Sequence, residues 1–172
     1  MKKALLVLAL VPLFTLSSVT FANEDVHLDK APIDASNHES LQRGARTFVN
    51  YCLNCHSANY MRYNRLLEIG LTEQQIKDNL LFAGDKVGDT MKVAMNKTDA
   101  KKWFGVAPPD LSVEVRARGA DWIYTYMRGF YRDSTRPSGW NNVAYDKVAM
   151  PHVLYELQGE QTLNHETHQL TL

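Results

Sequence analysis

The residues best suited to chemistry are Cys52, Cys55 and His56, which form the pattern C-x-x-C-H. This pattern is the attachment signal for a c-type haem. Two thiols three positions apart can each form a thioether bond to one vinyl group of a single porphyrin. The His after the second thiol then supplies a ring nitrogen as an axial ligand of the iron. The motif therefore predicts one covalent haem c on Cys52 and Cys55, with His56 as an iron ligand.

A C-x-x-C pair has other uses. A thioredoxin-like dithiol would follow a strand and would give His56 no role. Half of a zinc site would need two further ligands, and His165 and His168 lie far along the chain, outside any finger-like spacing. A disulfide across a two-residue gap would be strained. The export signal described below favours haem attachment over these alternatives.

Met150 is the predicted second axial ligand. Pro151 follows it and stiffens the loop, which fixes where the sulfur points. Met150 also comes after the helix that should close the domain, where small c-type cytochromes usually place this ligand. A thioether ligand favours ferrous iron and raises the potential. His152 is the rival ligand, and it would lower the potential.

The other methionines are weaker candidates for this ligand. Met61 is too close to His56 in sequence to reach the opposite face of the porphyrin. Met127 occupies a position typical of core packing. Met91 and Met95 fall one helical turn apart in a charged segment.

The N-terminus carries an export signal. Met1–Lys3 is positively charged, Ala4–Leu16 is largely apolar, and Thr20–Ala22 offers small residues at both positions that signal peptidase reads. The apolar run is too short to cross a bilayer. We therefore predict a signal peptide over residues 1–22 and an exported c-type cytochrome domain over residues 23–172.

Charge and composition narrow the range of possible functions further. The chain has 19 basic and 19 acidic residues, and loss of Lys2 and Lys3 with the signal would leave it mildly acidic. That balance does not fit nucleic-acid binding. Both cysteines belong to the motif, so we expect no disulfide. No apolar stretch after residue 22 has the length of a membrane span.

Two helices are expected to frame the motif. Apolar residues recur at helical spacing over residues 40–55, and Ser36 or Asn37 is a suitable N-cap. Thr72 opens a capping box, and its helix should end at Gly84. The preceding residues 23–38 are polar and irregular. They predict an extended lead-in.

The middle of the chain should carry the wall of the haem site. Residues 84–102 are charged and resemble a surface excursion, after which Trp103 should return to the core. Pro108 and Pro109 fix a stiff, extended segment that can lie flat against a ring. Asp110 or Ser112 is a candidate cap for the helix that follows.

The last part of the chain begins with an aromatic core helix. Trp122, Tyr126 and Met127 share one face of it. Residues 133–147 are rich in Pro, Gly, Asn and Ser and predict a loop. The tail over residues 158–172 is polar, and its pattern predicts no fixed structure.

Together these residues resemble the cytochrome c1 family, the haem subunits of the ubiquinol–cytochrome c reductase (cytochrome bc1) complex. The similarity covers roughly residues 40 to 155. The haem motif is common to all c-type cytochromes, whereas Pro-Pro-Asp-Leu-Ser followed by Arg-Ala-Arg is much more specific, as is the long separation of His56 from Met150. The matching stretches, in family order, are Cys52–Ser57 with Tyr60 and Tyr63, Trp103–Ser112, Arg116–Gly119 and Met150–Pro151.

The resemblance implies a mainly helical class I c-type cytochrome fold, with insertions between the C-x-x-C-H motif and Met150. It implies the same thioether and axial-ligand residues that the motifs predict. It adds three contacts with the haem: Arg118 would pair with a propionate, and Pro108 and Pro109 would lie along the haem edge.

The resemblance also implies partners and a location. The protein would accept an electron from the Rieske iron–sulfur subunit, beside cytochrome b, and pass it to a periplasmic cytochrome c, with no bond chemistry of its own. It would lie on the periplasmic side of the bacterial inner membrane. The family's C-terminal membrane helix does not appear before Leu172. We therefore expect a fragment of a longer protein, held at the membrane through the complex or through the missing anchor.

Three other functions stay open at this point. The chain is also compatible with a free periplasmic electron carrier, with the haem subunit of a dehydrogenase, or with an enzyme or gas sensor whose iron has an open site.

Overall fold

The computed structural model describes residues 26–172, so the predicted signal peptide lies outside the described residues. In this part of the chain, η1 (Phe48–Cys52) is a π-helix and η2 (Tyr63–Ile69) is a 3₁₀-helix. In chain order the elements are α1 (His38–Thr47), η1 (Phe48–Cys52), β1 (Ala58–Arg62), η2 (Tyr63–Ile69), α2 (Glu73–Asn79), β2 (Thr90–Met91), α3 (Lys97–Phe104), α4 (Glu114–Arg118), α5 (Ala120–Arg128), β3 (Phe130–Arg132), β4 (Trp140–Asn142), α6 (Tyr155–Gln158), β5 (Thr162–Asn164) and β6 (Gln169–Thr171).

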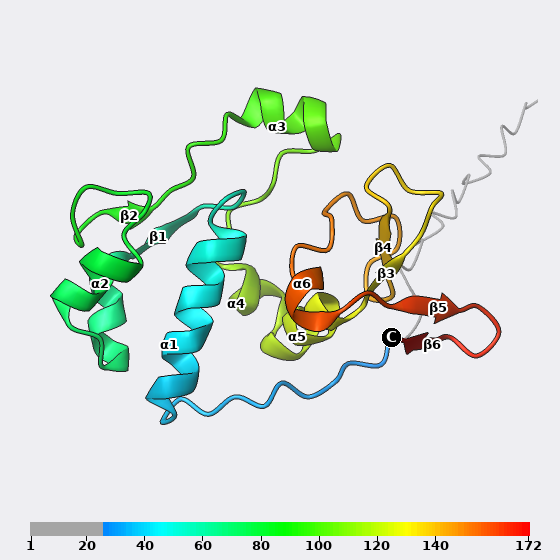
Figure 1. The fold of residues 1–172 in the computed structure, drawn as a ribbon, viewed down its shortest axis with the longest axis horizontal. Coiled ribbons are helices and arrows are strands. Elements are labelled where there is room, and N and C mark those ends of the chain that lie inside the picture. Colours follow the sequence, from blue (N-terminus) through cyan, green and yellow to red (C-terminus); the bar gives the residue numbers. More distant parts are fainter. Residues whose placement is uncertain (1–25) are drawn as a thin grey trace, which may run out of the picture.

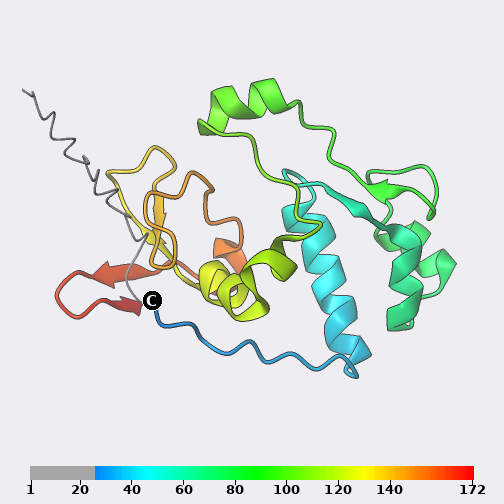
Figure 2. The ribbon, with the colours of Figure 1, turned by 180° about the vertical axis from the view of Figure 1, so that it is seen from behind.

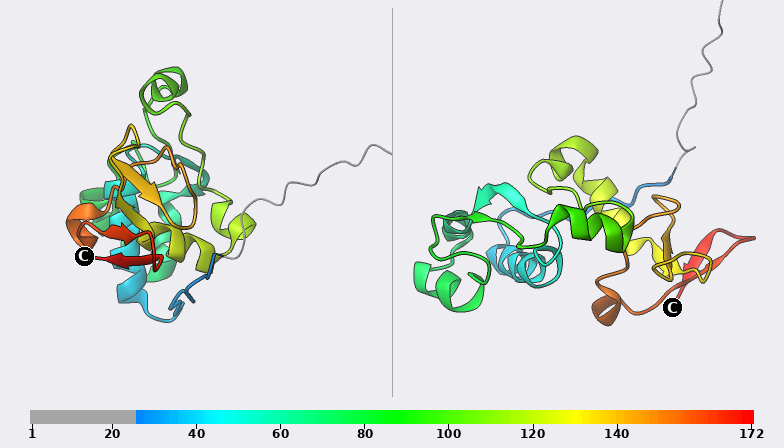
Figure 3. Two further views of the ribbon diagram at one scale, coloured as in Figure 1. Left: turned by 90° about the vertical axis from the view of Figure 1, so that its right-hand side faces the viewer. Right: turned by 90° about the horizontal axis from the view of Figure 1, so that it is seen from above.

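The described chain is mostly helical with three small sheets, which confirms the mainly helical prediction. Each sheet is one antiparallel pair: β1 with β2, β3 with β4, and β5 with β6. Two halves are visible in Figure 1, one over residues 38–91 and one over residues 114–172, with α3 on the segment that joins them. The same division appears from behind and from above (Figures 2 and 3).

The first half begins with the predicted helix. The side chain of Asn37 accepts a hydrogen bond from the amide of Ser40 at 3.0 Å, which fixes the start of α1. The helix continues through η1 and ends at Cys52 instead of Cys55. Its apolar side packs into a core cluster made of Val49, Leu53, Ala58, Tyr63, Leu66, Ile76, Leu80 and Met91.

The capping box at α2 is also present. The Thr72 hydroxyl accepts from the Gln75 amide, and the Gln75 side chain accepts from the Thr72 amide. The helix ends at Asn79, however, and not at Gly84. Ile76 and Leu80 then reach the core within two turns, and the chain turns away once they are buried.

The segment after α2 differs from its prediction. Met91 lies in β2 and is 2% exposed, so it belongs to the first core cluster and not to a surface helix with Met95. Trp103, expected to return to the core, is 65% exposed at the end of α3. Ala100 is the buried residue of that helix, since its other positions are mainly Lys, Thr and Asp.

The second half is built around aromatic residues of α5 and the β3–β4 hairpin. Phe130, Trp140 and Val148 form its core cluster, with Tyr126 and Met150 packed against it. The predicted loop over residues 133–147 was therefore wrong in part, because it contains β4, whose residues are all buried.

The sequence pattern did not predict β4 because two of its three residues are Asn. Asn142 is 1% exposed, and its amide is satisfied internally. Its Nδ2 donates to the Tyr126 carbonyl at 2.7 Å, and its Oδ1 accepts from the Ala144 amide at 2.8 Å. A buried Asn that makes such bonds is a stable interior residue although it is typical of loops.

Both ends of the described chain are fixed to the second half. Residues 26–37 form no helix or strand, and the amide of Asp29 donates to the Thr125 hydroxyl of α5 at 2.9 Å. The polar tail forms the β5–β6 hairpin, for which the sequence predicted no structure. Arg132 holds it by pairing with Glu160. Across residues 26–172 we find no helix with the length and apolar character of a bilayer span.

Candidate haem-attachment site

The C-x-x-C-H motif lies in a tight turn at the end of the first helix. The amide of Leu53 donates to the Phe48 carbonyl, which is the hydrogen bond of a π-helix. Short π-helical segments often occur at functional sites. The amide of His56 then donates to the Cys52 carbonyl at 2.8 Å. Leu53 is 4% exposed and packs into the first core cluster. This buried residue anchors the two cysteines on either side of it.

Cys52 and Cys55 are both free and half-buried. Burial raises the pKa of each thiol, and the proximity of Cys55 raises that of Cys52 further. Both groups are therefore protonated at neutral pH. Two neighbouring thiols at the correct spacing suit addition to two vinyl groups.

The alternative uses of the cysteine pair find no support. A helix, not a strand, precedes the motif. Within residues 26–172 no three or more His, Cys, Asp or Glu side chains gather as a metal site. His165 and His168 are exposed and belong to the terminal hairpin and its turn.

His56 is oriented by the backbone of the proline segment. Its Nδ1 lies 2.7 Å from the carbonyl oxygen of Pro109. A carbonyl oxygen can only accept, so Nδ1 carries a proton, which in the neutral ring leaves the lone pair on Nε2. A neutral imidazole held this way by an outer hydrogen bond is the form that ligates a metal.

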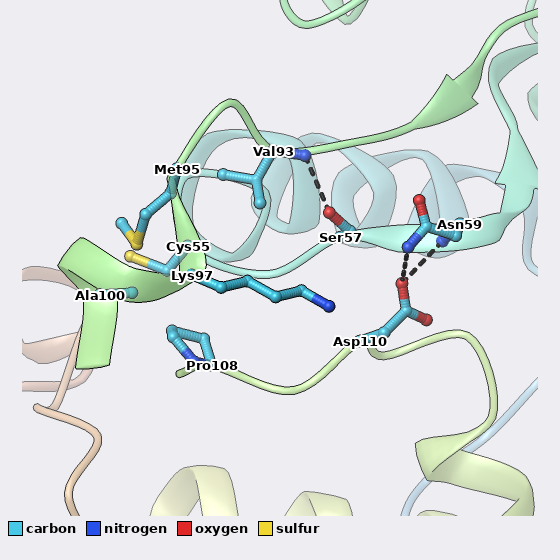
Figure 4. A pocket seen from close by; sticks show the side chains of 9 residues that line it. All are labelled: Cys55, Ser57, Asn59, Val93, Met95, Lys97, Ala100, Pro108 and Asp110. Carbon is cyan, nitrogen blue, oxygen red and sulfur yellow. Dashed lines mark hydrogen bonds between the residues drawn. The ribbon is translucent and has the colours of Figure 1, made fainter. Parts of the chain in front are cut away.

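Residues 109–112 are bonded to the strand that follows the motif. The Leu111 amide donates to the Ser57 carbonyl at 2.8 Å. Asp110 accepts from the Asn59 amide at 3.0 Å and from the Asn59 side chain at 2.6 Å (Figure 4). The Tyr60 amide donates to the Ser112 hydroxyl at 3.0 Å. These bonds fix the segment that presents the Pro109 carbonyl.

The predicted capping role of Asp110 or Ser112 was wrong. Val113 occupies the N-cap position of α4, with no side-chain bond to the helix. Asp110 instead braces its own loop through Asn59 and the Ser112 amide, 2.9 Å away. Partial burial acts to raise the pKa of Asp110, but these hydrogen bonds outweigh it and hold the pKa below its ordinary value.

A hollow of about 100 Å³ lies beside Cys55, with Pro108 and Met95 among its walls (Figure 4). A second hollow, of about 280 Å³, is lined partly by Val49 and Phe82 and shares Met95. Pro108 and Cys55 therefore line the same hollow. Two free thiols, an imidazole whose Nδ1 is bonded to the backbone, and a partly apolar hollow beside them fit a covalent haem.

Met150 lies in the second half of the molecule, apart from His56 in the first. It is half-buried against the second core cluster. The hydroxyl of Tyr126 donates a hydrogen bond to its sulfur, with 3.4 Å between the oxygen and Sδ. Burial raises the pKa of Tyr126 to about 12, so this hydroxyl keeps its proton.

His152, the rival ligand, is an aromatic core residue here. It is 1% exposed, and its ring stacks on Phe130 at 5.0 Å and meets Trp140 edge-on at 5.0 Å. Neither ring nitrogen has a hydrogen-bond partner among the described residues. Burial lowers the pKa of His152, so the ring is neutral at pH 7.

Arg118 lies at the end of α4. Its Nε pairs with the Glu114 carboxylate at 2.8 Å, and its guanidinium lies 4.4 Å from the centre of the Trp122 ring. These contacts place the guanidinium over the Trp122 ring of α5. The bond to a haem propionate stays a prediction.

Several contacts of the site were not predicted from the sequence, and three of them show the reason. They are the Asn59–Asp110 brace, the bond from the Val93 amide to the Ser57 hydroxyl at 2.9 Å, and the Tyr126–Met150 bond. Each joins residues far apart in the chain, and no local pattern marks the partner of a single polar side chain. Tyr126 alone gave a signal, because it was the one hydroxyl on the predicted aromatic face.

Comparisons with known proteins show what the chain is similar to. Residues 28–169 match the profile of the Cytochrome C1 family. The chain is 50% identical, over 157 residues, to "Cytochrome c1" of Allochromatium vinosum, covering 91% of this chain and 64% of that one. It is 57% identical, over 162 residues, to a Nitrosomonas europaea protein named "Ammonia monooxygenase gamma subunit", covering 94% and 68%.

A more distant relative is the mitochondrial "Cytochrome c1, heme protein" of Neurospora crassa, 26% identical over 172 residues, covering 81% of this chain and 52% of that one. The chain thus spans about two thirds of the two bacterial relatives and about half of the fungal one.

Proposed function

The chain belongs to the cytochrome c1 family, and we propose that it is the electron-transfer subunit of a respiratory cytochrome bc1 complex. Members of this family carry one covalently bound haem c. The fold would be of the class I c-type, with insertions between the C-x-x-C-H motif and Met150. The bound haem supplies a reversible one-electron centre, and the chain itself makes and breaks no substrate bond.

The observation that carries this proposal is the bond from His56 Nδ1 to the Pro109 carbonyl, next to two free thiols. Cys52 and Cys55 would hold the haem through thioethers. Pro109 fixes the tautomer of His56 and points Nε2 away from its own segment. Met150 would supply a thioether as the other axial ligand, Arg118 would pair with a propionate, and Pro108 would lie at the haem edge.

The partners follow from the family. An electron would arrive from a Rieske iron–sulfur protein, beside cytochrome b, and leave to a periplasmic cytochrome c. Residues 1–22 would direct export to the periplasmic side of the bacterial inner membrane, where the complex or an anchor beyond Leu172 would hold the protein.

Mass analysis of the exported protein tests the attachment. We expect the intact chain from residue 23 to carry the added mass of one haem, with the label on the peptide that holds Cys52 and Cys55. A Cys52→Ser, Cys55→Ser double variant should carry none, whereas a Met127→Leu control should match the wild type. An unlabelled wild-type chain would overturn the proposal.

Co-purification tests the assembly. Membranes expressing a tagged full-length gene product should yield cytochrome b and a Rieske protein with it. Recovery of the haem protein alone from the periplasm would support a free carrier instead. A ferrous spectrum that changes on adding carbon monoxide would indicate an open iron site, as in a gas sensor.

A further inference from the structure

Residues 26–37, here called the strap, connect the two halves of the molecule a second time. Along the chain the halves are joined by residues 92–113, which carry α3. The strap starts beside α5 in the second half and runs along the edge of the molecule to the start of α1 in the first (Figures 1 and 2). It forms no helix or strand, so its course depends on the contacts at its ends.

The first end of the strap is bonded to α5. The amide of Asp29 donates to the Thr125 hydroxyl at 2.9 Å, and the amide of Ala31 donates to the Asp121 carboxylate at 2.8 Å. The Arg128 guanidinium lies 3.4 Å from the Asp29 carboxylate. Thr125 is buried, so its bond to the strap is shielded from water and is stronger for that reason.

The other end of the strap is Asn37, whose side chain caps α1. That helix continues through η1 to Cys52, the first cysteine of the haem motif. At the far end of the strap, α5 contacts Met150 through the hydroxyl of Tyr126. The strap therefore joins the helix that leads into the motif to the helix that touches Met150.

We infer that the strap is a tether that keeps Met150 within reach of a haem attached to the first half. This inference rests on the proposed function. The thioethers would form on Cys52 and Cys55 in one half, and the second axial ligand would come from the other half. Movement of the halves away from each other would then break the bond between Met150 and the iron. A contact that holds the halves together makes that movement rarer.

Exogenous imidazole measures this opening, because it binds the ferric iron only when Met150 has left it. Its apparent affinity is proportional to the fraction of molecules in the open state. Thr125→Val replaces the hydroxyl that accepts from Asp29 by a methyl group of similar size. Loss of one hydrogen bond from the closed state should tighten imidazole binding to the haem-loaded protein by about twofold to tenfold.

Thr47→Val is the matched control. The Thr125 hydroxyl also donates to the carbonyl of Asp121, four residues earlier, and the Thr47 hydroxyl makes the same bond to Arg43 in α1. Thr47 is at the opposite end of α1 from the strap. The control therefore removes the same helix bond and leaves the strap in place, and its imidazole affinity should match the wild type.

Asp121→Ala is a second, independent variant. Asp121 is exposed at the start of α5, so its replacement leaves the core intact. It removes the acceptor of the Ala31 amide and should tighten imidazole binding in the same direction as Thr125→Val.

Trypsin cleavage after Lys30 reports on the strap without reference to the iron. Lys30 is exposed and lies between the two bonded amides, so cleavage there needs the strap to leave α5. Mass spectrometry should show faster cleavage at this site in Thr125→Val and Asp121→Ala than in the wild type. Cleavage after Lys77 of α2 is the internal reference, since a general loss of stability would speed both sites.

The outcomes separate the two proposals. A wild-type protein without the sulfur-to-iron band would overturn Met150 as the ligand, and with it the role of the strap in ligation. A wild-type protein with the band, in which Thr125→Val and Asp121→Ala bind imidazole no more tightly than Thr47→Val, would overturn the role of the strap alone. Faster cleavage after Lys30 at unchanged imidazole affinity would also overturn it, because the strap would then open without releasing Met150.

Discussion

The carbonyl oxygen of Pro109 holds Nδ1 of His56 at 2.7 Å, although the two residues are 53 positions apart. The acceptor belongs to the backbone, so no side-chain substitution at Pro109 removes it directly. Its position depends instead on the bonds that tie residues 109–112 to residues 57–60. The orientation of the His56 imidazole, the proposed iron ligand, can therefore be tested through a substitution at Asp110.

Replacing Asp110 by Ala should loosen the proline segment. The carboxylate accepts from Asn59 and from the Ser112 amide, and a hydrogen bond to a charged group contributes about 1.5–3 kcal/mol. We expect the free energy of unfolding, measured by urea titration, to fall by about 1–3 kcal/mol. Asp110→Asn retains one acceptor oxygen and should lose less. Equal losses in the two variants would contradict the bracing role.

The same carboxylate predicts a pH dependence. The pKa of Asp110 in the folded protein is below its ordinary value of 3.8, because the bonds from Ser112 and Asn59 outweigh the opposing effect of burial. Its contribution to stability is therefore complete above pH 3.8 and is lost as the pH falls through the lowered pKa. In unfolding curves from pH 7 to pH 2.5, the difference between wild type and Asp110→Ala should shrink only below about pH 4. A difference that disappears near pH 6 would assign the effect to another group.

Replacing Met150 by Leu should remove the second axial ligand. Leu has a similar volume, so packing against the second core cluster should cost less than about 1.5 kcal/mol. The sulfur-to-iron band should vanish, carbon monoxide should bind the ferrous form, and the potential should fall by on the order of 100 mV, within the 0.8 V range set by axial ligands. Optical spectra and a redox titration measure all three. An unchanged spectrum would mean that another residue ligates the iron.

His152→Leu introduces the same side chain two residues away and tests the rival ligand. The ring is buried, and neither nitrogen is bonded to any residue of 26–172, so replacing it removes two desolvated polar atoms as well as an aromatic stack. These effects oppose each other, and we expect the free energy of unfolding to change by less than about 1.5 kcal/mol. The band and the potential should match the wild type. Loss of the low-spin spectrum in this variant, with Met150→Leu unaffected, would make His152 the ligand.

Local chemistry in the sequence predicted the parts of the fold that depend on neighbours along the chain. Asn37 caps α1 and Thr72 opens α2, because a cap needs only residues within one turn. Helix ends were less certain. The end of α2 depends on the burial of Ile76 and Leu80. That burial is a property of the assembled core and cannot be read from the local sequence.

Residues with distant partners were mispredicted for a physical reason. Met91 is in a charged segment but becomes a core residue once β2 pairs with β1, and Trp103 is apolar but lies on a helix with little buried surface. The motif predicts Cys52 and His56 as haem-binding residues because haem attachment needs those residue types at that spacing. The groups that orient them, such as Asp110, are recognisable only in the folded chain.

The expected role of Arg118 can be tested by substitutions that remove or keep its positive charge. The positive guanidinium near a propionate would disfavour further positive charge on the iron, so Arg118→Gln should lower the midpoint potential. We expect a shift of up to about tenfold in the ferric-to-ferrous ratio, or about 59 mV. Arg118→Lys keeps the charge and should restore most of the potential, although it loses the Nε that pairs with Glu114. Arg116→Gln, at an exposed position of the same helix, is the control and should leave the potential unchanged. If both Gln variants lower the potential equally, the effect is a general one of surface charge and Arg118 has no propionate partner.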